Sequence, residues 1–207
     1  MDIMADYDNK IPYAGVVARV IAYLVDCLVL FAGLLVWQAA LYVFNPIVRA
    51  VQSGQQPSSA KLHLWVFATA TIPFLFYFAL TQSSARQATP GMRLLKLKLI
   101  SVGGGPVRFG QALLRAAVLL IPFELNHAVM FHLTPRDGQP PTAMFWLGYI
   151  IVWALIALYI AAIPLTRRRQ SVHDLLTGTA VVAVSQRAGM SGAGASPLPT
   201  GPFNSAH

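Results

Sequence analysis

The stretch Arg19–Leu30, RVIAYLVDCLVL, is apolar enough to be buried or to lie in lipid, yet it carries an arginine and, seven residues later, an aspartate. It belongs to a longer apolar segment, residues 16–44, which can cross a hydrocarbon core of about 30 Å as a helix rising about 1.5 Å per residue. Charges at membrane depth are costly and almost always face protein or water. The two charges therefore predict a helix that packs against other helices.

Three more apolar segments of spanning length follow: residues 62–81, 109–133 and 142–165. The composition points the same way, because 56% of the 207 residues are hydrophobic and 11% are charged. The predicted fold class is an all-α membrane protein, a four-span helix bundle with no room for a large soluble enzyme domain. The expected parts are an N-terminal segment, a transmembrane domain and a disordered Gly/Ser/Pro-rich tail, over residues 1–15, 16–186 and 187–207.

The basic residues behind the net charge of +8 cluster between the apolar segments, where Lys and Arg set the orientation of a membrane protein. We interpret them as topology signals and expect no nucleic-acid partner. Most lie between the second and third segments or after the fourth: Arg86, Arg93, Lys96, Lys98, Arg108 and Arg167 to Arg169. Both termini are therefore predicted to face the cytoplasm.

A different pattern follows the second segment, in LLKLKLI at residues 94–100. Apolar and basic residues alternate there with period two, which favours a half-buried strand over an amphipathic helix along the headgroups. The β-branched run TAVVAVS, residues 179–185, lies on the same predicted cytoplasmic side. We expect residues 94–101 and 179–185 to pair, because pairing satisfies backbone groups that a lone strand leaves open. The pairing would bring Asp174 close to Arg19.

Asp26 is the costliest charge in the first segment. At 100° per residue it lies within about 20° of Arg19 on the helix and roughly 10 Å farther along the axis, too deep to reach the interface. Two interpretations stay open for it. Asp26 is an ion or proton site, or it is a structural counter-charge for Arg19 or for Arg115 in the third segment.

The third segment also holds Glu124 and His127, beyond a proline, Pro122, that can kink the helix. These two residues form either a proton-handling pair or, as we favour, a hydrogen-bonded pair near the outer interface. His127 and His132 are poor co-ligands for a metal, because they lie about 140° apart on a helix. The sequence holds no zinc motif, phosphate loop or nucleophile elbow, so we expect no catalytic residue, metal or cofactor.

Three features together resemble the RDD family of small bacterial integral membrane proteins, which is named for one arginine and two aspartates. Arg19 and Asp26 match the R and the first D, and Asp174 in HDLLTGT matches the second D. TPGMRLL, residues 89–95, matches the turn of the family, TPG followed by a basic and then apolar residues. The resemblance spans roughly residues 13–184 and implies a location in the bacterial cytoplasmic membrane.

The resemblance also implies an activity, the sodium/proton antiport proposed for some members. A carboxylate in a low-dielectric site can bind a proton or a cation, and their competition couples the two fluxes. Four spans are few for a transport path, so this hypothesis requires a homo-oligomer in the bilayer. The alternative hypothesis is a non-catalytic accessory or assembly subunit of a larger membrane complex. An enzyme is not expected, because no nucleophile and base can be paired.

Overall fold

The computed structural model describes residues 11–135 and 139–184, so the predicted tail and the first ten residues lie outside the described residues. Four helices are long and apolar enough to cross a membrane, as predicted: Val16–Leu41, Ser59–Ser83, Phe109–His132 and Ala143–Leu165. The first is α2 (Val16–Leu41), and it ends earlier than expected, because a 3₁₀ turn, Tyr42–Phe44, follows it. The third and fourth are α7 (Phe109–His132) and α8 (Ala143–Leu165).

The second spanning helix changes its winding along its length. It consists of α4 (Ser59–Val66), a π-helical turn (Phe67–Thr71) and α5 (Ile72–Ser83). The π-helical turn comes just before Pro73, whose missing N–H interrupts the regular helix ladder. The Thr69 hydroxyl donates to the Trp65 carbonyl, 2.7 Å away, and accepts from the Gln38 amide at 2.9 Å, which ties this turn to α2.

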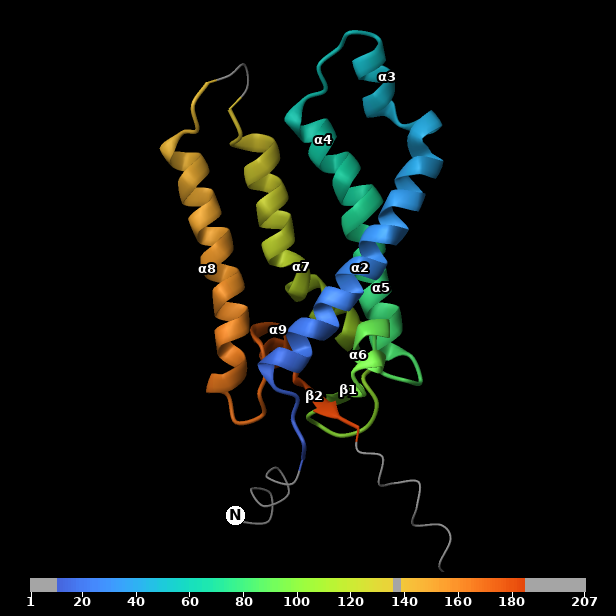
Figure 1. Ribbon diagram of the computed structural model, residues 1–207, viewed down its shortest axis with the longest axis vertical. Coiled ribbons are helices and arrows are strands. Elements are labelled where there is room, and N and C mark those ends of the chain that lie inside the picture. Colours follow the sequence, from blue (N-terminus) through green and yellow to red (C-terminus); the bar gives the residue numbers. More distant parts are fainter. Residues whose placement is uncertain (1–10, 136–138, 185–207) are drawn as a thin grey trace, which may run out of the picture.

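The short elements gather at the two ends of the bundle (Figure 1). A small helix, α3 (Pro46–Gln52), lies at one end. The opposite end, here called the sheet end, holds the remaining short elements: α6 (Pro90–Leu94), β1 (Leu97–Ser101), α9 (Val172–Thr177) and β2 (Thr179–Ala183).

β1 and β2 form an antiparallel pair, which confirms the predicted pairing. The register sets Leu97 opposite Ala183 and Ser101 opposite Thr179. The prediction was wrong at the start of β1, because Leu94 ends α6. The Thr89 side chain caps α6 and Pro90 occupies its first turn, two strong helix-start signals that the alternating pattern concealed.

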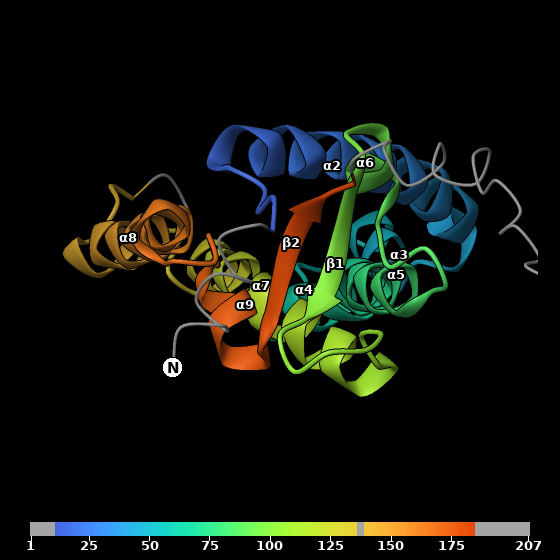
Figure 2. The same cartoon turned by 90° about the horizontal axis from the view of Figure 1, so that it is seen from below.

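At the sheet end, α6 packs on α2 beside the strand pair, and Figure 2 shows α8 standing to one side of this group. The contact between α6 and α2 depends on Gly91. A Cβ atom at this position would lie 2.1 Å from the Ala22 carbonyl oxygen, so a side chain larger than hydrogen does not fit. The core around this contact is made of small and aliphatic side chains: Ala14, Ala22, Ala88, Met92, Leu97, Leu99, Val107, Ala112 and Val181.

Candidate functional site

Asp174 lies at the centre of a buried charge cluster at the sheet end. It is the third residue of α9, and its carboxylate accepts the backbone N–H of Ser171 at 3.2 Å, as part of a capping box. The Thr179 hydroxyl also donates to this carboxylate, at 3.2 Å. Contacts within the local sequence therefore hold Asp174 at the start of α9.

Two arginines from different spanning helices reach this carboxylate. Arg19 Nη1 lies 2.5 Å from Asp174 Oδ2, while Arg115 Nε and Nη2 lie 2.8 and 2.7 Å from Oδ1. All three side chains are at most 3% exposed. Burial alone would raise the pKa of Asp174, but Arg115 and Arg19 outweigh it and hold the pKa well below its usual range. Asp174 therefore stays ionised and joins α2, α7 and α9, and its predicted closeness to Arg19 is confirmed.

The arginines extend this cluster to uncharged neighbours. Arg115 donates to Gln82 Oε1 at 3.0 Å and to the Tyr23 hydroxyl at 3.4 Å, and Tyr23 in turn lies 3.1 Å from His173 Nε2. Burial, followed by the charge of Arg115, lowers the pKa of His173 to about 3. His173 is thus neutral at pH 7. Sequence reasoning passed over His173, whose one signal was its place beside Asp174.

Asp26 has a different environment. Its carboxylate is 1% exposed and accepts three uncharged donors: the Thr89 hydroxyl at 2.5 Å, the Gly91 N–H at 2.8 Å and the Tyr77 hydroxyl at 2.8 Å. Thr89 serves twice, because its oxygen also accepts from the Met92 N–H and so caps α6. The TPG turn is therefore a binding partner for Asp26 as well as a helix start.

Of the two interpretations of Asp26, the counter-charge for Arg19 or Arg115 is therefore wrong, and the two aspartates form separate sites. Within the described residues, no arginine pairs with Asp26, because Arg19 and Arg115 both point to Asp174. The two sites adjoin across a void of about 10 Å³, whose lining includes Arg19, Asp26 and Arg115. The physical reason is distance along α2, since two helical turns separate Arg19 from Asp26 and the TPG turn meets Asp26 first.

Glu124 lies in the other half of the bundle, on α7. Its Oε1 accepts from the Thr71 hydroxyl and lies 3.2 Å from His127 Nδ1, which brings together the pair expected from the sequence. Its Oε2 lies 3.3 Å from Nε2 of His63, a residue of α4, and His63 Nδ1 is 3.1 Å from His132 Nε2. Because an ionised carboxylate only accepts, all three neighbours of Glu124 act as donors.

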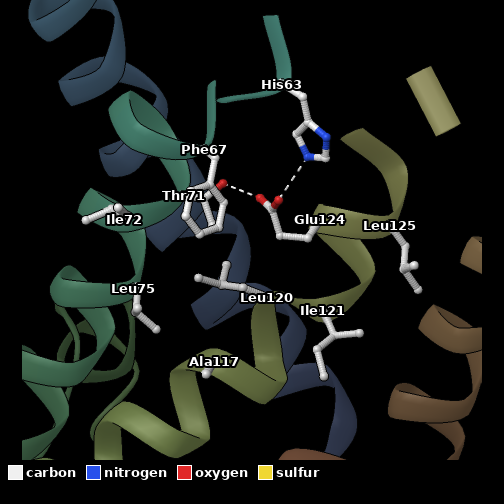
Figure 3. A pocket seen from close by; sticks show the side chains of 10 residues that line it. All are labelled: His63, Phe67, Thr71, Ile72, Leu75, Ala117, Leu120, Ile121, Glu124 and Leu125. Atoms are coloured by element: carbon white, nitrogen blue, oxygen red, sulfur yellow. Dashed lines mark hydrogen bonds and ion pairs between the residues drawn. The ribbon is translucent and has the colours of Figure 1, made fainter. Parts of the chain in front are cut away.

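Glu124 and His63 also border open space. One cavity of about 370 Å³ lies between the second and third spans, with Glu124, His63 and Thr71 at one end and apolar side chains below them (Figure 3). A second hollow of about 390 Å³ shares Glu124 and His63 and reaches exposed His132. Sequence reasoning missed His63, because its role comes from the packing of α4 on α7.

The described residues contain no group of three or more His, Cys, Asp or Glu side chains that could hold a metal ion. A model of the RDD family matches residues 13–178, a stretch that includes both aspartate sites and Glu124. No curated protein and no solved structure matches the chain.

Proposed function

The chain belongs to the RDD family, and we propose that it exchanges cations for protons across the membrane, with Glu124 as the carboxylate that binds each in turn. The observation that carries this proposal is the contrast in access. Glu124 borders hollows of about 370 and 390 Å³, whereas Asp26 borders a void of about 10 Å³. An exchange site must be reached by its ions, and intramembrane acids that face a cavity are the usual candidates.

The two family aspartates suit a structural role better. Asp174 is held ionised by two arginines, and Asp26 is 1% exposed and borders a void of about 10 Å³. Glu124 differs from both: it is 26% exposed, and no Lys or Arg contacts it within the part of the chain that the structure describes. Its charge can therefore be neutralised by a proton or balanced by a cation, and this competition couples the two fluxes.

The distribution of Lys and Arg residues supports an orientation in which the sheet end and both termini face the cytoplasm of a bacterial cell. Glu124 then lies in the outer half of the membrane. Sodium is the cation that the family resemblance implies, and a homo-oligomer would supply the transport path that four helices alone do not complete.

Flux in reconstituted vesicles tests the proposal. Purified protein is placed in liposomes that contain a pH-sensitive dye, and an imposed sodium gradient should change the internal pH. Glu124→Gln should abolish this change while the protein still folds, because the amide keeps the size but cannot exchange a proton. Wild-type protein without cation-dependent proton flux, or a Glu124→Gln variant that keeps it, would remove the proposal.

The second candidate is an accessory or assembly subunit. It is supported by the buried contacts of Asp174 and Asp26, because both carboxylates join elements of the fold to one another. Gentle detergent extraction followed by mass determination separates the two. A homo-oligomer favours exchange, and a stable assembly with other chains favours the accessory role.

A further inference from the structure

The cavity beside Glu124 combines one carboxylate with a long apolar lining. Figure 3 shows Glu124 at one end and Ala117 at the other, with Leu75, Leu120 and Ile121 between them. From this geometry we infer that the cavity binds a protonated amine with a compact apolar body, the ammonium on Glu124 and the body among the aliphatic side chains.

The carboxylate of Glu124 can accept one more hydrogen bond, and an ammonium group suits it in both charge and donor capacity. A carboxylate offers about four acceptor positions. Thr71 and His127 use those on Oε1, and His63 uses one on Oε2, so Oε2 keeps room for one more donor among the described contacts. An ammonium N–H meets this need, and its positive charge balances Glu124 in a low-dielectric site, where a charge-assisted hydrogen bond is strongest.

The lining selects the rest of the ligand. Apart from Glu124, His63 and Thr71, the cavity is bordered by seven apolar side chains: Phe67, Ile72, Leu75, Ala117, Leu120, Ile121 and Leu125. A bare metal ion would leave this surface unused, whereas an alkyl or cycloalkyl group would cover it. At the roughly 30 Å³ that a water molecule occupies in the liquid, the cavity holds about a dozen non-hydrogen atoms.

The amine would compete with the proton and the inorganic cation for the same carboxylate. As an assignment of substrate class, the inference rests on the proposed exchange function. As a binding site, it rests on the cavity and Glu124 alone.

Binding of 1-adamantylammonium to purified protein, measured by titration calorimetry against its neutral counterpart 1-adamantanol, tests the site. The amine should bind saturably and at least tenfold more tightly than the alcohol. Glu124→Gln should weaken the amine at least tenfold and leave the alcohol unchanged. Ala117→Leu, which fills the far end of the cavity, should weaken both, and Ala154→Leu on the exposed surface of α8 is the matched control that should change neither.

Equal binding of amine and alcohol to wild-type protein would overturn the inference without any variant, so it stays testable even if Glu124→Gln fails to fold. Amine binding that Ala117→Leu leaves unchanged would overturn it too, because the amine would then be partitioning into lipid or detergent. Sodium-driven proton flux on the same preparations separates the two proposals. Flux that depends on Glu124 without amine binding removes this inference alone, and amine binding without flux removes the exchange function alone.

Discussion

Replacing Asp174 with asparagine should be among the most destabilising conservative changes in the chain. The side chain keeps its size, but an amide has one oxygen, and its NH₂ group must then face a buried donor on Arg19 or Arg115. Breaking a buried ion pair by removing one partner costs about 3–5 kcal/mol. Because about 1.4 kcal/mol is a factor of ten, the ratio of folded to unfolded protein should fall more than about a hundredfold.

The excess of positive charge gives this prediction an internal control. Two arginines share one carboxylate, so Arg19→Gln leaves a balanced pair of Arg115 and Asp174 and should cost less than Asp174→Asn. The double variant should cost less than the sum of the two single changes, because it leaves Arg115 alone unpaired, whereas Asp174→Asn leaves both arginines unpaired.

Fluorescence-detected gel filtration measures the folded yield of these variants, and thermal unfolding in detergent measures their stability. Asp174→Asn protein within about 0.5 kcal/mol of wild type would refute the reasoning. Additivity of the two changes within about 0.5 kcal/mol would also refute it, since residues in one network should couple.

Four further outcomes are expected. Gly91→Ala should lower the folded yield strongly, since its methyl group meets the Ala22 carbonyl, and a normal yield would contradict the close contact of α6 and α2. Asp26→Asn should cost about 1–3 kcal/mol, less than Asp174→Asn, because it disturbs hydrogen bonds to uncharged donors. The free energy of unfolding should decrease as the pH drops from about 6.5 towards 3, because His173 takes up a proton in the unfolded chain but stays neutral when buried in the folded one. In the His173→Gln variant, the free energy of unfolding measured against pH should decrease less steeply over this range. A reporter active only outside the cytoplasm, fused after residue 187, should give no signal, and strong activity would reverse the orientation.

The features that sequence reasoning predicted well are those set by local pattern. Apolar length determines the four spans, and β-branched residues after Gly178 predicted β2. The capping signals at Thr89 and Pro90 are also local and indicate a helix start. The alternation that begins at Leu94 nevertheless led to the prediction of a strand there, although Leu94 is the last residue of α6.

The features that sequence reasoning missed depend on which side chains meet across helices. Sequence reasoning left Asp26 as either an ion site or the counter-charge of an arginine, and it did not foresee that a backbone N–H and two hydroxyls would donate to its carboxylate. His63 carried no pattern of its own within α4. Its contact with Glu124 arises because α4 packs against α7, and no local sequence pattern indicates which residues of two packed helices will meet.

The π-helical turn has a consequence for the spacing of the Glu124 site. His63 and Thr71 are eight positions apart, which in a regular α-helix would set them about 80° apart around the axis. A π-helical turn absorbs one extra residue, so the pair behaves like residues seven apart, within about 20° of one another, and both reach Glu124. Deleting one residue from 67–71 would restore regular α-helical winding, and α4 and α5 would keep their present orientation relative to each other. A one-residue gap in an alignment at this point is therefore compatible with an unchanged site.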